Sequence, residues 1–307
     1  MTFSNLGKFI NKPIFSFMDI WDDIKASFRE GSVITRLIYV NLAVFLFFRI
    51  FSVIFFLSGN EFDWLHWFEL PASFHLLLRQ PWTLITYMFL HFNFLHILFN
   101  LLVLYWFGKI FLDYYDQDQL LGLYLLGGIA GGLTYMVAYN IFPVFSGVVT
   151  SSYLLGASAS IIAILIAAAF RDPNRDIYLF LIGRIPLKFL AVFMVISYIL
   201  GISASNAGGN LAHLGGALMG WLFFARLGKG HDITSFMSGM VRWLQKISKP
   251  KPKVKVVHRQ PPRDDHEYNR QKAADQNELN RILDKIGKEG YESLTKEEKE
   301  TLFRHGK

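Results

Sequence analysis

The chain has 307 residues, of which 52% are hydrophobic and only 18% are charged, and it carries a formal net charge of +7. This apolar balance excludes an ordinary soluble domain. Nearly uncharged runs of about 20 residues recur along the first part of the chain, and that length crosses a hydrocarbon layer of ~30 Å, so we expect a membrane protein. The basic excess falls in short loops and a tail, where the positive-inside effect and anionic lipid explain it without nucleic acid.

The first segment, residues 1–32, predicts an amphipathic helix on the cytoplasmic membrane surface. Its apolar residues follow helical spacing and leave charged residues on the other face. These apolar residues are Phe17, Ile20, Trp21, Ile24 and Phe28. The segment lacks the basic, apolar and small-residue order of a cleaved signal peptide, so we expect the first membrane span to act as the insertion signal.

Six membrane spans are predicted. They cover residues 37–57, 95–112, 119–140, 150–170, 186–204 and 209–226. The flanking basic residues gather on one side and include Lys8, Arg36, Lys109, Arg171, Lys188 and Arg226, whereas only Arg79 falls on the other side. The positive-inside rule therefore predicts a multi-pass protein of the cell (inner) membrane with both termini in the cytoplasm.

The first external loop, residues 58–94, is unusually long for a connection between two spans. It carries Trp64, Trp67 and Trp82, and tryptophan prefers the headgroup level, where its ring is half wet. We therefore predict an interfacial loop with short helices.

The chain after the sixth span divides into two predicted parts. Residues 229–265 are rich in Lys, Arg and Pro and predict a basic linker. Residues 266–307 predict a small cytoplasmic helical hairpin, with a capping box between Thr295 and Glu298, and its partner is unknown. The expected fold class is thus an all-α membrane protein, a six-helix bundle over residues 33–228 with a small soluble helical tail.

Polar residues inside the apolar spans need a reason, because an unpartnered polar group is costly in hydrocarbon. The second span contains His96 and Asn100 on one helical face, the fourth contains Ser158, and the sixth contains His213. In the predicted topology these spans run in the same direction, and each places its polar residues within about 5 to 12 Å of the outer interface. Three separate stretches therefore bring polar groups to one depth.

A close contact between the fourth and sixth spans would let Ser158 meet His213. Gly216 and Gly220 have the small-xxx-small spacing that lets helix backbones approach. A serine hydroxyl hydrogen-bonded to an imidazole is the pair that nucleophilic catalysis requires. The span interiors contain no acidic residue, so a catalytic pair here would be a dyad, with no metal or cofactor, and with His96 and Asn100 available to stabilise an oxyanion.

These features resemble the rhomboid family of intramembrane serine proteases, in its bacterial six-helix form. The resemblance covers about residues 33–228 and rests on the long first loop, "RQPWTLITYMFLHFNFLHILFNLL", "GASA" and "NLAHLGGALMGW" in this order. It implies that Ser158 is the nucleophile and His213 the base, with His96 and Asn100 in the oxyanion hole. It also implies that the substrates are single-span or membrane-proximal segments of other proteins, cut near the outer face.

Two positions depart from the family pattern. Ala159 follows the serine where the family usually has glycine, and its methyl group could tighten the fit of Ser158 against the sixth span. Ile162 stands where the family often has an aromatic residue beneath the histidine, so His213 is expected to rest on an aliphatic surface.

Other interpretations remain beside the protease. The departures allow a catalytically inactive rhomboid-like protein that binds transmembrane segments, and a small transporter is disfavoured because no intramembrane carboxylate offers an ion relay. Ser160, about 200° around the helix from Ser158, is interpreted as a packing residue. His91 is interpreted as a loop-stabilising residue, and "GGIAGG" at 127–132 as a close helix contact.

Overall fold

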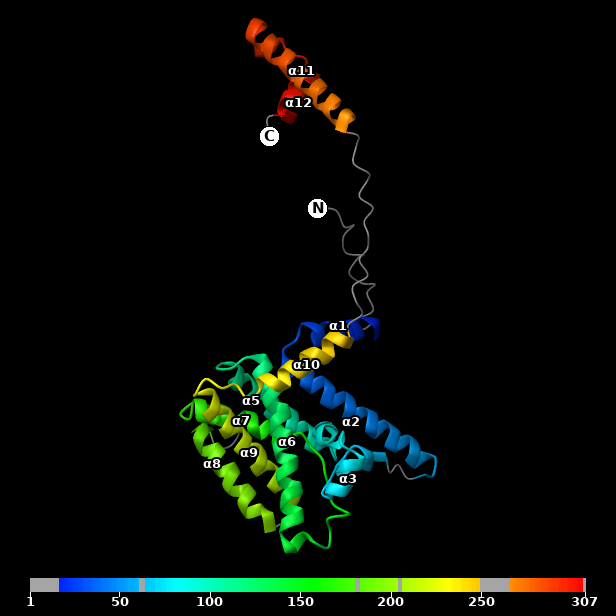
Figure 1. Cartoon of the computed structure of the whole chain (residues 1–307), viewed down its shortest axis with the longest axis vertical. Coiled ribbons are helices and arrows are strands. Elements are labelled where there is room, and N and C mark those ends of the chain that lie inside the picture. The colour runs from blue at the N-terminus through cyan, green and yellow to red at the C-terminus, as the bar shows by residue number, and fades with distance from the viewer. Residues whose placement is uncertain (1–16, 61–63, 180–182, 204–205, 249–264, 306–307) are drawn as a thin grey trace, which may run out of the picture. The chain divides into compact units, whose positions relative to one another are not determined.

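The computed structural model describes residues 17–60, 64–179, 183–203, 206–248 and 265–305, and most of them are helical (Figure 1). The chain divides into two compact units, residues 1–249 and residues 250–307. The larger unit carries all of the apolar helices.

Three of the described helices are long and apolar enough to cross a membrane: α2 (Val33–Leu57), α5 (Phe94–Leu112) and α6 (Gln117–Ile141). The helix α1 (Phe17–Glu30) precedes them, and its Trp21 is 56% exposed. Two shorter apolar helices, α7 (Ser158–Arg171) and α8 (Leu187–Leu200), and the glycine-rich α9 (Ala207–Leu227) follow.

The loop between α2 and α5 contains the short helices that the sequence predicts. They are η2 (Trp64–Trp67), α3 (Phe74–Arg79), α4 (Thr83–Thr86) and η3 (Tyr87–Phe89). Its three tryptophans are exposed, and Trp82 Nε1 donates a hydrogen bond of 2.7 Å to the carbonyl of Trp67. The loop also contributes the strand β1 (Leu70–Pro71) to the larger unit.

The predicted fourth span, residues 150–170, begins too early. Instead of a helix, the chain forms the strand β2 (Tyr153–Leu154), which pairs antiparallel with β1, and α7 begins only at Ser158. The turn between them passes through Gly156, whose φ of +128° is a conformation that other residues rarely adopt. Its N–H donates to the carbonyl of Tyr87, which ties the turn to the first loop. Ser158 is therefore the first residue of its helix.

A small antiparallel hairpin joins α7 to α8, with strands β3 (Asp176–Leu179) and β4 (Gly183–Pro186). The all-α expectation did not include this hairpin or the β1–β2 pair. After α8, the short η5 (Gly201–Ser203) precedes the segment that enters α9.

Small residues bring α6, α7 and α9 together. A Cβ atom built on Gly127 would lie 2.5 Å from the Cβ of Ala163, which shows how closely α6 meets α7. On α9, a Cβ built on Gly216 would lie 2.2 Å from the carbonyl oxygen of Ala159, and one on Gly220 would lie 2.3 Å from that of Ala163. The predicted close contacts at "GGIAGG" and at Gly216 and Gly220 are therefore confirmed.

The predicted basic linker, residues 229–265, is wrong in its first half. Residues Ser235–Ser248 form the helix α10, which packs against α6. Thr234 lies directly over Gly122, and Arg242 pairs with Asp118, so contacts that are distant in sequence hold this helix. The prediction failed because the Lys and Pro residues at 249–262 dominated the composition of the whole segment. Residues 249–264 themselves lie outside the described part of the chain.

The smaller unit contains α11 (Asp265–Glu289), η6 (Tyr291–Ser293) and α12 (Lys296–His305). Gly290, with φ of +82°, ends the first helix. The expected capping box is present, since Thr295 N–H donates to Glu298 Oε2 at 2.9 Å and Glu298 N–H donates to Thr295 Oγ1 at 3.3 Å. The Thr295 N–H bond, with Lys285 Nζ at 3.0 Å, lowers the pKa of Glu298 to about 2.

Candidate active site

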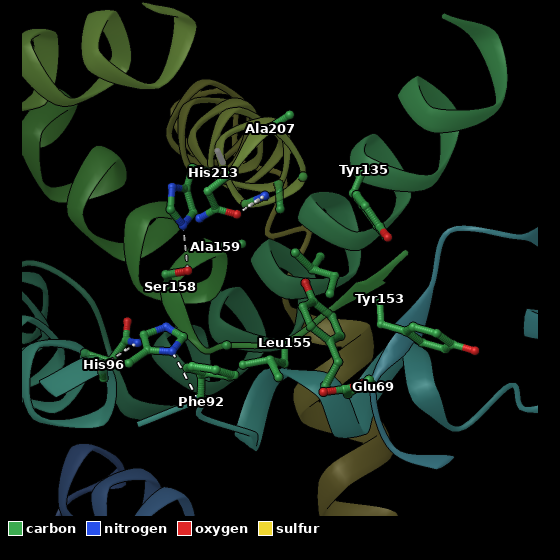
Figure 2. A pocket seen from close by; sticks show the side chains of 18 of the residues that line it. Glu69, Phe92, His96, Tyr135, Tyr153, Leu155, Ser158, Ala159, Ala207 and His213 are labelled. Carbon is green, nitrogen blue, oxygen red and sulfur yellow. Dashed lines mark hydrogen bonds between the residues drawn. The ribbon is translucent and has the colours of Figure 1, made fainter. Parts of the chain in front are cut away.

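A cavity of about 1010 Å³ opens in the larger unit, between α5, α7, α8, α9 and the loop that precedes β1. Its lining includes all four polar residues that the sequence singles out: His96, Asn100, Ser158 and His213. Figure 2 shows this cavity, with Ser158 and His213 facing each other across a dashed hydrogen bond. The structure therefore brings the predicted residues into one space.

The central contact joins Ser158 Oγ to His213 Nε2 at 2.7 Å. Ser158 begins α7, and His213 lies two turns into α9, so the distance depends on how these two helices pack. That distance is within the range in which an imidazole can take a hydroxyl proton. The pair thus has the geometry of a nucleophile and its base.

Ala159 fits at a position where the family pattern has glycine. Its carbonyl oxygen lies against Gly216 of α9, whereas its methyl group faces α6, where a Cβ built on Gly131 would lie only 2.6 Å from it. The expectation that the methyl group presses Ser158 against α9 is therefore wrong. The missing side chain at Gly131 provides the space for it.

His213 has an aromatic neighbour, which the expectation of an aliphatic surface did not include. Tyr198 of α8 lies against it, with ring centroids 4.5 Å apart and an interplanar angle of 58°. An aromatic neighbour thus comes from another helix, although position 162 is isoleucine. Sequence reasoning missed Tyr198, because an aromatic residue inside an apolar span carries no local signal of its role.

The other ring nitrogen of His213, Nδ1, is buried and has no hydrogen-bond partner among the described residues. When Nε2 accepts the Ser158 hydroxyl, the neutral ring carries its proton on Nδ1. No carboxylate in the described part of the chain orients that proton. The bond to Ser158 and the ring contact with Tyr198 are then the described interactions of the imidazole.

His96 lies on the other side of the turn that leads into Ser158. A Cβ built on Gly156 would lie 3.1 Å from His96 Nε2 and 3.7 Å from Ser158 Oγ, so the absence of a side chain at Gly156 lets the imidazole approach the hydroxyl. The N–H of Phe92 donates to His96 Nδ1 at 3.4 Å. A neutral His96 therefore carries its proton on Nε2, the nitrogen next to Gly156.

Asn100 supports the same wall of the cavity one turn further along α5. Its Nδ2 donates to the carbonyl of His96 at 3.0 Å, and the residue is 8% exposed. Asn93 begins the helix, and its Oδ1 accepts the N–H of His96 at 2.8 Å. The cap and the amide together fix the backbone that carries His96.

His91 lies next to His96, although on an ideal helix the two would be about 140° apart. Because α5 begins only at Phe94, that angle does not apply, and the two ring centroids are 5.2 Å apart, edge to face. Burial lowers the pKa of His91 to about 4, with the neighbouring His96 adding to the effect, so the ring is neutral near pH 7. The His91 ring therefore packs against His96 as an uncharged group.

A second polar group in the cavity was not predicted at all. Glu69 ends the loop before β1, is 5% exposed, and has its Oε2 2.6 Å from Nδ1 of His66. In the sequence this carboxylate lies in a loop and resembles a solvent-exposed residue. The pairing of β1 with β2 brings it to the cavity that also contains Ser158.

Comparison with known proteins gives a family match for the part of the chain that carries this cavity. Residues 78–230, which contain all four predicted site residues, match the family model of the Rhomboid domain. Residues 264–307 match a family of unknown function, DUF6576.

Two curated relatives are similar to the chain. It is 28% identical over 219 residues to the RHOMBOID-like protein 12, mitochondrial, of Arabidopsis thaliana, an alignment that covers 68% of this chain and 62% of that protein. It is 30% identical over 151 residues to the Presenilin-associated rhomboid-like protein A, mitochondrial, of Danio rerio, covering 47% of this chain and 36% of that protein. The chain thus spans less than two thirds of either relative.

Proposed function

Because the chain belongs to the rhomboid family through residues 78–230, we propose that it is an intramembrane serine endopeptidase. Ser158 is the nucleophile and His213 is the general base. The observation that carries the proposal is the 2.7 Å contact between Ser158 Oγ and His213 Nε2 inside a cavity.

The chemistry requires two steps. His213 Nε2 takes the hydroxyl proton as Ser158 Oγ attacks the carbonyl carbon, and the same proton then passes to the leaving amine as the peptide bond breaks. Water, activated by His213, next attacks the acyl-enzyme, which releases the new carboxyl end and restores the hydroxyl group. Among the described residues no carboxylate bonds His213, so in this mechanism the orientation of its ring depends on Tyr198 and on helix packing.

The developing oxyanion is stabilised by donors around Gly156. The backbone N–H of Ser158 belongs to the first turn of α7, where it has no partner within the helix and the helix dipole favours negative charge. His96 Nε2–H and the Asn100 amide lie on the facing wall. Removing one such donor typically costs about 3 to 4 kcal/mol of transition-state stabilisation.

The proposed substrates are single-span or membrane-proximal segments of other membrane proteins. Under this proposal the helices α2 and α5 to α9 form the six spans, and the shortness of α7 suits a serine that begins below the outer interface. The termini lie in the cytoplasm, and the protein resides in the cell membrane.

The test is covalent labelling of the full-length protein in lipid vesicles with a fluorophosphonate probe. We expect an adduct on Ser158, identified by mass spectrometry of the modified peptide, together with cleavage of a single-span model substrate. Ser160→Ala is the matched control and should still be labelled, since the Ser160 side chain is fully buried two residues away. A folded protein that neither reacts nor cleaves would instead be the inactive membrane-segment binder.

The inactive alternative depends on Ala159 and Ile162, and the structure weakens both reasons. The extra methyl group fits against Gly131, and Tyr198 supplies the aromatic contact that Ile162 cannot. Both departures are thus compensated from neighbouring helices.

Tyr198→Ala should lower kcat by about 10- to 100-fold with little change in KM, because a base that is displaced by about 1 Å loses its alignment. Tyr198→Phe keeps the ring and should retain most of the activity. Phe193→Ala is the control, since Phe193 lies on the same helix but is 67% exposed. Equal loss in the alanine and phenylalanine variants would show that the ring contact does not position His213.

A further inference from the structure

The short helix η3 (Tyr87–Phe89) holds the turn that precedes Ser158. The carbonyl of Tyr87 accepts the N–H of Gly156 at 2.9 Å. Gly156 has a φ of +128°, and a Cβ built on it would lie 3.7 Å from Ser158 Oγ. The position of η3 therefore controls where this turn lies, together with the serine that follows it.

The same segment leads into the facing wall of the proposed oxyanion hole. After η3 ends, α5 begins at Phe94, and His96 lies in its first turn. A Cβ built on Gly156 would lie 3.1 Å from His96 Nε2, so the turn and the imidazole approach each other closely. A shift of η3 would therefore disturb both sides of the hole.

Two tyrosine hydroxyls tie η3 to α6 in a reciprocal arrangement. Tyr87, on η3, donates its hydroxyl proton to the carbonyl of Gly128 on α6 at 2.6 Å. Tyr124, on α6, donates its hydroxyl proton to the carbonyl of Met88 on η3 at 3.2 Å. The two side chains are 1% and 0% exposed, so bulk water does not compete for these bonds. Removal of either hydroxyl would loosen η3 from α6.

Asn41 of α2 supports the second of these bonds. Its Nδ2 donates to the Tyr124 hydroxyl oxygen at 3.3 Å and to the carbonyl of Leu37 at 2.8 Å. Because the amide donates to that oxygen, the hydroxyl keeps its proton for Met88. Asn41 is fully buried in a strongly apolar helix, where a polar side chain is costly without a partner. An amide at this position therefore indicates that it holds the direction of the Tyr124 hydroxyl.

We propose that Tyr124 is a positioning residue for the oxyanion hole, which acts through η3 on the turn at Gly156, and that Asn41 orients its hydroxyl. The proposal rests on the proposed protease function. The bonds run from Asn41 to Tyr124, from Tyr124 to the carbonyl of Met88, and from the neighbouring carbonyl of Tyr87 to the N–H of Gly156. They keep the donors around Gly156 aligned with the position where negative charge develops.

Tyr124→Phe tests this proposal, because it removes the hydroxyl and keeps the ring. We expect kcat for a single-span substrate in proteoliposomes to fall about 10-fold with little change in KM, since the displaced donors act on the transition state. The affinity for a peptidyl aldehyde should fall by a similar factor, because its adduct with Ser158 places an oxygen in the hole. Gly156 lines the cavity, so water reaches its amide, and hydrogen exchange there should become about 10-fold faster.

Asn41→Leu removes the support for the hydroxyl and leaves Tyr124 itself in place. We expect a smaller loss of kcat, about 3-fold. Adding Asn41→Leu to Tyr124→Phe should change kcat little further, because no hydroxyl then remains to be oriented. A loss in the double variant equal to the product of the two single losses would overturn the role of Asn41.

Tyr114→Phe is the matched control for a purely structural loss. The Tyr114 hydroxyl donates to Asp172 Oδ2 at 2.5 Å, at the opposite end of α7 from Ser158. This variant should lower the temperature of thermal unfolding and leave kcat and the exchange of the Gly156 amide unchanged.

These measurements separate the proposal from the protease function. A kcat for Tyr124→Phe equal to that of the parent, or an equal loss of kcat in Tyr114→Phe, would overturn the positioning role and leave the protease intact. Faster exchange at Gly156 in Tyr124→Phe, with a folded parent that neither cleaves nor reacts with the fluorophosphonate probe, would support the coupling of Tyr124 to the turn and overturn the protease.

Discussion

Ser158→Ala and His213→Ala are each expected to reduce cleavage of a single-span substrate to background, a loss of about 10⁴-fold or more. The hydroxyl and the imidazole act as one unit, since their atoms lie 2.7 Å apart and neither performs the attack alone. The double variant should therefore be no slower than either single variant. The measurement is the single-turnover rate in proteoliposomes.

Ser160→Ala is the control for these variants. Ser160 is fully buried, and its hydroxyl has no hydrogen-bond partner among the described residues, so its removal should change the rate little. If Ser158→Ala cleaves at the parental rate, Ser158 is not the nucleophile. If His213→Ala alone remains active, another group takes the proton.

Gly216→Ala should be the most damaging substitution outside the dyad. The added Cβ would lie 2.2 Å from the carbonyl oxygen of Ala159, a backbone atom that cannot turn aside, so α7 and α9 must move apart. Overpacking of this kind typically costs about 1 to 3 kcal/mol in stability. Because the contact is next to Ser158, we expect the rate to fall by about 100-fold as well, from misplacement of the hydroxyl and imidazole by ~1 Å.

Gly220→Ala and Gly239→Ala separate these two effects. A Cβ added at Gly220 would lie 2.3 Å from the carbonyl oxygen of Ala163, one turn further from the dyad, so this substitution should destabilise the protein similarly and reduce the rate less. Gly239 on α10 has open space around it, and alanine there should be neutral or slightly stabilising. Thermal unfolding in detergent measures the change in stability, and the rate of probe labelling at Ser158 measures the change in reactivity. Equal behaviour of Gly216→Ala and Gly239→Ala would contradict the close packing of α7 and α9.

The candidate site was partly predictable because some of its signals are local. Gly216 and Gly220 stand four residues apart, and polar residues at matching depths of apolar spans need partners wherever the spans meet. His96 and Asn100 were predicted by the same reasoning, and the family order of the motifs assigned their roles. These signals are visible in the sequence alone, because they depend on residue type and spacing.

The features of the site that were not predicted depend on contacts between segments that are distant in the sequence. Tyr198 of α8 supplies the aromatic contact to His213 that Ile162 of α7 cannot make. Gly131 of α6 leaves the space that the methyl group of Ala159 occupies. The turn at Gly156 shortened the fourth helix, because β2 pairs with a strand from the first loop. No window of sequence contains both partners of any of these contacts.

The sequence by itself therefore predicted a membrane protein, its main apolar helices and the four polar residues that meet in the cavity, since hydrophobicity and helical spacing are properties of neighbouring residues. The tertiary structure alone decided where α7 begins, which ring supports His213, how α10 docks on α6, and that Glu69 enters the cavity. Each of these depends on which surfaces of separate segments pack together, and packing free energy is shared between residues that lie far apart in the chain.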